Sequence, residues 1–132
     1  MKTLLDKLWA RKEIRRRADG TALLWVDRHL VHEGSHHAFA KLAARGLSVA
    51  EPGLTFGVAD HYAPTQGAPA TPAIAGMIAG LAANTERHAI ACFGPADPPQ
   101  GIVHVIPPDH GLPPPGLPLP LGARHTPTHA PV

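Results

Sequence analysis

An aspartate followed at once by a histidine closes an apolar run in the first half of the chain. Asp60 and His61 come directly after residues 54–59, which read as a strand, the second after a buried strand at residues 22–26. An imidazole beside a carboxylate has a raised pKa and donates a proton near neutral pH, so the pair suits general acid–base chemistry. On spacing alone, a strand-end turn followed by a helix N-cap explains the same two residues equally well.

Further histidines follow in segments that could deliver them to the same place. His104 lies in an apolar run at residues 101–106, and His125 lies in the polar segment 122–129. Upstream, His32 lies in a segment with the sequence Trp-Val-Asp-Arg-His-Leu-Val-His-Glu at residues 25–33. Histidines brought from separate strand ends would line a polar active site. Other histidines are read as surface residues: His36, His37, His88 and His110.

Elements that could position these side chains alternate along the chain. We expect helices at residues 4–17, 36–45 and 72–92 and strands at 22–26, 54–59 and 102–106. Residues 117–121 form an edge strand or an extended loop, because Pro118 and Pro120 lack the amide hydrogen a ladder needs. Alternation of strands and helices predicts a three-layer α/β/α fold with a partly parallel sheet, whose strand ends gather functional residues.

A chain of 132 residues is long enough for one domain with a core of moderate size. The 16 prolines are unevenly placed. We expect residues 1–94 to be better packed and the Pro- and Gly-rich residues 95–132 to be poorly ordered at the C-terminal end.

Composition excludes several classes of function. Basic residues between Lys7 and Arg17 form a solvated helix face, since no aromatic residues interleave with them as in a nucleic-acid site. No signal peptide and no membrane span are recognised. The single cysteine, Cys92, excludes an internal disulfide and fits the reducing cytoplasm. It is read as a small buried apolar residue of the long helix.

Five segments in one order resemble the large subunits of 3-isopropylmalate dehydratases, within the aconitase family. They are residues 25–33, 52–56, 60–66, 100–105 and 122–129. The resemblance covers residues 2–130, which correspond to about the first third of a family member. It implies a partial aconitase-type N-terminal domain spanning residues 1–132.

The resemblance also implies a function. Members of this family are hydro-lyases of leucine biosynthesis that interconvert 2-isopropylmalate and 3-isopropylmalate, using a [4Fe–4S] cluster held by three cysteines and a small-subunit partner. The Asp60–His61 pair then protonates the departing oxygen, and His104 helps to orient the leaving group. His125 matches the histidine of the family motif Gly-Asp-Ser-His-Thr, and His32 matches a substrate-contacting position.

The sequence departs from the family pattern in ways that predict no activity for this chain alone. No counterpart of the cluster cysteines is present, and the motif reads Gly122, Ala123, Arg124, His125 and Thr126. Two alternatives remain: a non-catalytic remnant that binds a small-subunit partner, or a histidine-rich zinc or nickel module built on His29, His32, His36 and His37. The substrate could also be a related hydroxy-diacid such as citramalate.

Overall fold

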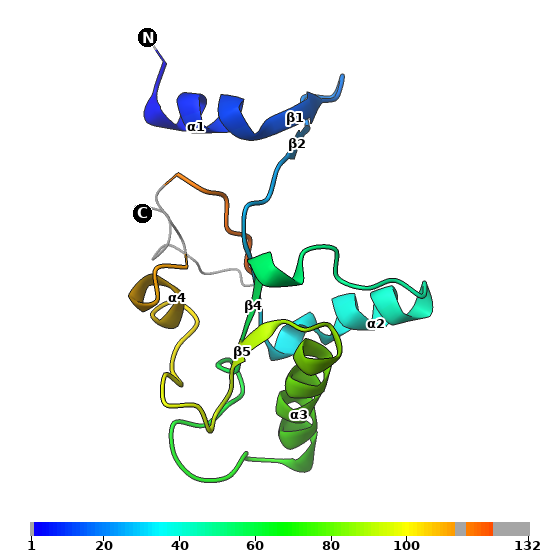
Figure 1. The fold of residues 1–132 in the computed structure, drawn as a ribbon, viewed down its shortest axis with the longest axis vertical. Coiled ribbons are helices and arrows are strands. Elements are labelled where there is room, and N and C mark those ends of the chain that lie inside the picture. The colour runs from blue at the N-terminus through cyan, green and yellow to red at the C-terminus, as the bar shows by residue number, and fades with distance from the viewer. Residues whose placement is uncertain (1, 113–115, 123–132) are drawn as a thin grey trace.

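A parallel three-stranded sheet lies at the centre of the structure, a computed structural model that describes residues 2–112 and 116–122. Its strands are β3 (His29–Val31), β4 (Thr55–Val58) and β5 (Ala91–Phe93), in the order β3-β4-β5. Helix α2 (His36–Ala44) connects the first two strands, and α3 (Pro72–Arg87) connects the second pair (Figure 1). The three strands therefore end at one edge of the sheet.

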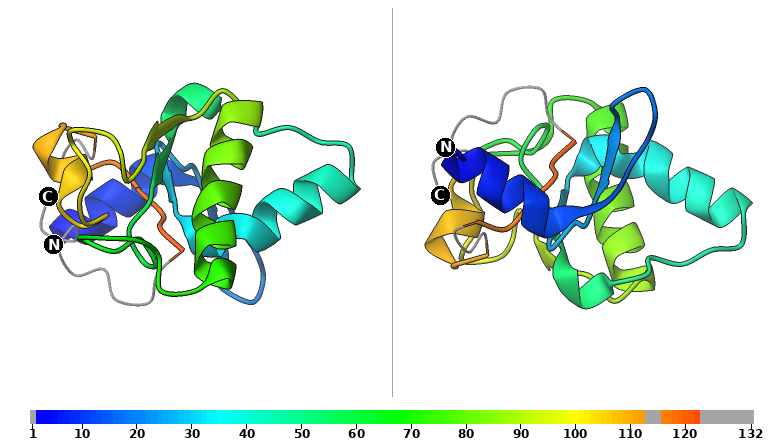
Figure 2. Two further views of the ribbon diagram at one scale, coloured as in Figure 1. Left: turned by 90° about the horizontal axis from the view of Figure 1, so that it is seen from below. Right: turned by 90° about the horizontal axis from the view of Figure 1, so that it is seen from above.

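Each face of this sheet carries its own apolar cluster. Neighbouring residues of a strand point to opposite faces, so Leu30 and Val31 belong to different clusters. On one face the buried residues include Phe39 of α2 and Leu81 of α3. On the other they include Val103 and Ile106, where the short helix α4 (Ile106–Asp109) begins. Figure 2 shows α2 and α3 on one side of the sheet and α4 on the other, which confirms the predicted three-layer α/β/α architecture.

The proline-containing segment at residues 117–121, predicted as an edge strand or an extended loop, lies along the edge strand β3. Leu121 forms a parallel bridge with Leu30, and the Leu30 amide donates to the carbonyl of Pro120 at 3.0 Å. The Asp27 amide donates to Pro118 at 3.2 Å. Both prolines therefore serve as hydrogen-bond acceptors, a role that does not require the amide hydrogen they lack.

The N-terminal residues form a separate arm whose structure differs from the expected long helix. Helix α1 (Leu4–Lys12) begins at a capping box between Thr3 and Asp6. It then gives way to an antiparallel hairpin of β1 (Glu13–Arg16) and β2 (Ala22–Leu24). The strand expected at residues 22–26 is present as β2, but its expected burial is wrong, since Leu23 and Trp25 are 60% and 52% exposed. Among the described residues, neither apolar cluster of the sheet includes a residue of this hairpin, which lies on the arm at the top of Figure 1.

Two other elements differ from the sequence prediction. The long helix ends at Arg87, and the residues expected to finish it form β5 after a reversal at Ala89, which has a φ of 55°. Residues 102–106 form a turn leading into α4, where a strand was expected. Val103 and Ile106 are buried while Ile102 and Val105 are exposed, a spacing of three that suits a helical turn.

The expectation of poor order at the C-terminal end concerns, in part, residues outside those described. In the described ranges, no helix is both long and apolar enough to cross a membrane. Two short 3₁₀ turns complete the secondary structure, Glu33–Ser35 after β3 and Pro52–Leu54 before β4.

Candidate active site

The Asp60–His61 pair lies directly beyond the carboxyl end of β4. A carboxylate oxygen of Asp60 is 3.6 Å from Nδ1 of His61, and the His61 side chain is 23% exposed. The same carboxylate oxygen of Asp60 accepts the amide hydrogen of Val103 at 2.8 Å. Asp60 thus faces the imidazole and also fastens the segment before α4 to the end of the strand.

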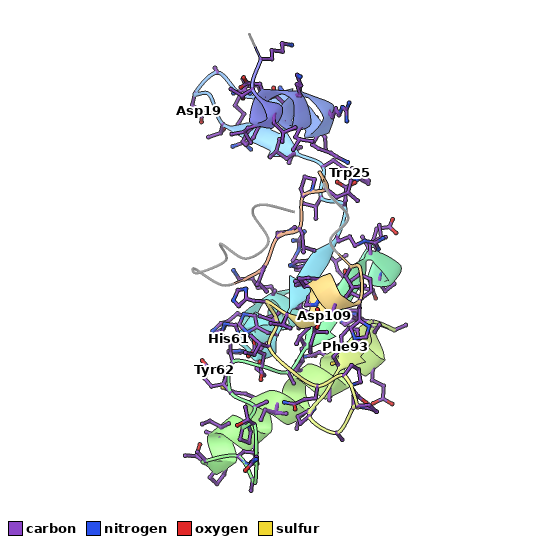
Figure 3. All side chains as sticks on the ribbon, turned by 90° about the vertical axis from the view of Figure 1, so that its left-hand side faces the viewer. Asp19, Trp25, His61, Tyr62, Phe93 and Asp109 are labelled. Atoms are coloured by element: carbon purple, nitrogen blue, oxygen red, sulfur yellow. The ribbon has the colours of Figure 1, made fainter. Side chains whose placement is uncertain are left out.

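His32 joins this pair from the end of the neighbouring strand β3. Its ring stacks on the ring of His61, with centroids 4.0 Å apart and planes inclined by 21°. The His32 residue is only 5% exposed. Figure 3 shows His61 beside Tyr62 and apart from Asp19 and Trp25 of the arm. Parallel strands place these side chains together because both strands end at one edge of the sheet.

Backbone groups occupy both ring nitrogens of His32. Its Nδ1 accepts the amide hydrogen of Gly34 at 3.1 Å. Its Nε2 lies 3.2 Å from the carbonyl oxygen of Gly122. Both nitrogens of His32 are therefore engaged within the chain.

Glu33 follows His32 and was given no role in the sequence prediction. The residue is 1% exposed, and its carboxylate accepts the amide hydrogens of His61 and Tyr62, each at 3.3 Å. A charged residue shortly after the apolar pair Leu30 and Val31 is only a weak sign of a functional role, because the sequence does not reveal that the Glu33 side chain turns inward. Its contacts become visible only once the ends of β3 and β4 are placed together.

Two predicted site residues remain, His104 and His125. His104 lies half-buried in the turn before α4, one residue after the Val103 amide that binds Asp60. His125 lies outside the described residues. The structure thus brings together Asp60, His61 and His32.

Among the described residues, one group has the composition and closeness of a metal site. It consists of His32, Glu33 and His61, with candidate ligand atoms within 4.8 Å of one another. A metal ion needs a free lone pair on each ligand nitrogen, whereas both nitrogens of His32 are held by backbone groups. Of the proposed histidine module, His36 instead places its Nδ1 3.1 Å from the Glu33 carbonyl oxygen.

We therefore expect no zinc site that depends on His32. Isothermal titration of the chain with zinc, repeated on His32→Ala, should give isotherms that agree within error. Because both ring nitrogens of His32 would have to leave their backbone partners first, any zinc uptake should come from other histidines, such as the exposed His36 and His37 of α2. A loss of tight zinc binding in His32→Ala, with the variant still folded, would contradict this expectation.

Cys92 does not provide a ligand set for an iron–sulfur cluster. It is the single cysteine of the chain and lies on β5, packed against Gly57 and Thr85. A methyl group added at Gly57 would lie 3.0 Å from the Cys92 sulfur and 2.8 Å from a Thr85 methyl. Burial raises the pKa of the Cys92 thiol. One protonated, packed thiol does not fit the cluster with three cysteine ligands that the sequence resemblance implies.

The raised pKa of Cys92 predicts slow thiol labelling. Only the thiolate reacts, so a pKa above that of a free thiol lowers the reactive fraction at pH 8, about tenfold for each pH unit by which the pKa rises. We expect Ellman's reagent to label the folded chain more slowly than the urea-unfolded chain. The folded rate should also keep rising with pH after the unfolded rate levels off. Equal rates in both states would contradict this prediction, and Cys92→Ser provides the blank.

Comparison with known proteins agrees with the motifs. The model of the aconitase family (aconitate hydratase) matches residues 6–131. The chain is 41% identical over 132 residues to 3-isopropylmalate dehydratase large subunits of two Thermus thermophilus strains, covering 97% of this chain and 28% of each relative. It is also 41% identical over 131 residues to the large subunit of Salinibacter ruber, covering 96% of this chain and 28% of that relative.

The chain thus spans about 28% of the length of these relatives. No solved structure matches it. The family model, however, matches nearly the whole chain, and its match includes the Asp60–His61 pair, His32 and Glu33. The chain belongs to the aconitase family.

Proposed function

We propose that this chain is the segment of a 3-isopropylmalate dehydratase-type hydro-lyase that carries the proton donor of the reaction. The observation that carries the proposal is the Asp60–His61 pair at the end of a parallel strand, in a chain 41% identical to such large subunits. The reaction would interconvert 2-isopropylmalate and 3-isopropylmalate by loss and return of water, in leucine biosynthesis.

His61 is the proposed general acid. Asp60 faces its Nδ1 at 3.6 Å, an arrangement that suits a carboxylate-assisted general acid. Asp60 is itself oriented by the Val103 amide. The predicted roles of His104 and His125 beside the leaving group remain part of this proposal.

His32 suits a supporting position better than the direct substrate contact predicted from the sequence. Both of its nitrogens bind backbone groups, and its ring face is against His61. We propose that it limits the movement of the His61 ring.

The chain alone is proposed to be inactive. Expelling hydroxide from an unactivated alcohol needs an electrophile at the leaving oxygen, and this chain lacks the cysteines to hold the cluster that its family uses. A small subunit is the expected partner, since the relatives are named large subunits. The single cysteine is compatible with the cytoplasm, and residues 1–132 are proposed to be one partial domain.

A chimaera tests the proposal. Residues 1–132 replace the matching segment of the Thermus thermophilus large subunit, which is assembled with its small subunit and assayed with 3-isopropylmalate and citramalate. A second chimaera adds Ala123→Asp and Arg124→Ser, because the family motif has these residues. Turnover of isopropylmalate by either chimaera, with none by the isolated chain, is expected. The proposal would be refuted if neither chimaera turned over isopropylmalate, or if the isolated chain did.

One observation favours the second candidate function, binding of a partner without catalysis. The arm exposes large apolar side chains, with Leu4 and Leu5 exposed by 72% and 67%. Copurification of the chain with an aconitase-type small subunit, lost when Leu4, Leu5 and Trp25 are changed together to serine, would support it.

A further inference from the structure

The side chain of Glu33 is buried and held by amides of a different strand end. Glu33 begins the 3₁₀ turn after β3 and is 1% exposed. A buried carboxylate is costly unless hydrogen bonds compensate for the lost water. At Glu33 the compensation comes from the loop after β4, through the amides of His61 and Tyr62.

Each carboxylate oxygen of Glu33 accepts a hydrogen bond from one of two consecutive amides. Oε2 accepts from His61 and Oε1 accepts from Tyr62, each at 3.3 Å. An ionised carboxylate has only acceptors, whereas a glutamine in its place would turn a donor toward one of the two amide hydrogens. The double contact therefore specifies a carboxylate at this position and fixes both the place and the direction of the loop.

The ring of His61 is restrained by His32 and Asp60. His32, the residue before Glu33, stacks its ring on the His61 ring with centroids 4.0 Å apart. Asp60 approaches the ring edge at Nδ1. Glu33 holds the backbone of His61, His32 contacts the face of the His61 ring, and Asp60 approaches its edge. The imidazole is therefore preorganised before any ligand arrives.

We propose that Glu33 is a positioning residue for His61: its carboxylate clamps the His61 and Tyr62 amides and so keeps the His61 imidazole stacked on His32. The role of the imidazole as proton donor rests on the proposed function, but the clamp does not.

Nuclear magnetic resonance of the 132-residue chain tests the clamp directly. Scalar couplings across hydrogen bonds should connect the amide nitrogens of His61 and Tyr62 to the side-chain carboxyl carbon of Glu33. In Glu33→Gln we expect amide exchange at His61 and Tyr62 to speed up by about ten- to hundredfold. The ring contacts between His32 and His61 should be lost, while the methyl shifts of Leu30 and Val58 stay in place. Glu51→Gln, a matched change of an exposed glutamate, should alter none of these signals.

Several outcomes would overturn the clamp. They are missing couplings in the unmodified chain, ring contacts that survive in Glu33→Gln, and equal acceleration of exchange at every amide, which would mean a general loss of stability. If the glutamine variant does not fold, the couplings in the unmodified chain decide the matter. Failure of the proposed function gives a different result, because both chimaeras would then be inactive while the couplings persist.

Discussion

Replacing His61 by glutamine is expected to lower kcat by about 10²- to 10⁴-fold in the active chimaera, the usual contribution of a positioned general acid. Glutamine keeps the polarity and approximate reach of the side chain but has no titratable proton to give. Because the change leaves the rest of the binding site in place, KM should change much less than kcat. Steady-state kinetics with 3-isopropylmalate measures both constants.

His37→Gln supplies the matched control for this prediction. It makes the same chemical change at an exposed histidine of α2 whose ring contacts His36 rather than the Asp60–His61 pair. Its kcat should stay within about twofold of the parent, as expected of a surface change. Similar losses in both variants would mean that imidazoles in general, and not His61, matter to turnover. An unchanged kcat in His61→Gln would remove His61 from the proton-transfer step.

The sequence predicted the core of the fold because its signals are local there. The apolar run that becomes β4, the helix after Ser35 and the edge character of the proline-containing segment 117–121 all agree with the prediction. Placement of Asp60 and His61 at a strand end followed from the same run. These features depend on periodicity and on the missing amide of proline, which a sequence shows directly.

The misassigned elements depend on tertiary contacts instead. The residues of β5 were read as the end of a helix, because Cys92 and its neighbours are apolar and suit either a helix or a strand. Only the reversal at Ala89 separates β5 from α3. β3 was missed because a three-residue strand between charged and histidine residues has almost no periodicity. Glu33 was missed for a similar reason, since its burial depends on two amides 28 and 29 residues away.

Changing Leu30 to alanine is expected to reduce the free energy of unfolding by about 2 to 5 kcal/mol. Leu30 is fully buried, and it packs with Val58, Val103 and Ile106 in the cluster on the α4 face of the sheet. Removing its side chain leaves a cavity at the place where β3, α4 and the edge segment meet. Domains of this size are stable by only about 5 to 15 kcal/mol, so the loss should shift a urea transition strongly.

The matched control is Leu23→Ala, the same deletion at a strand residue that is 60% exposed on the arm. It should change the free energy of unfolding by no more than about 0.5 kcal/mol. The contrast separates the sheet from the arm, because the arm's hairpin buries no comparable cluster among the described residues. Equal destabilisation by the two changes would mean that the arm packs against a core as the sheet does, which would contradict the exposure of Leu23. A negligible effect of Leu30→Ala would mean that the Leu30 cluster does not hold the strand ends on which Asp60, His61 and Glu33 depend.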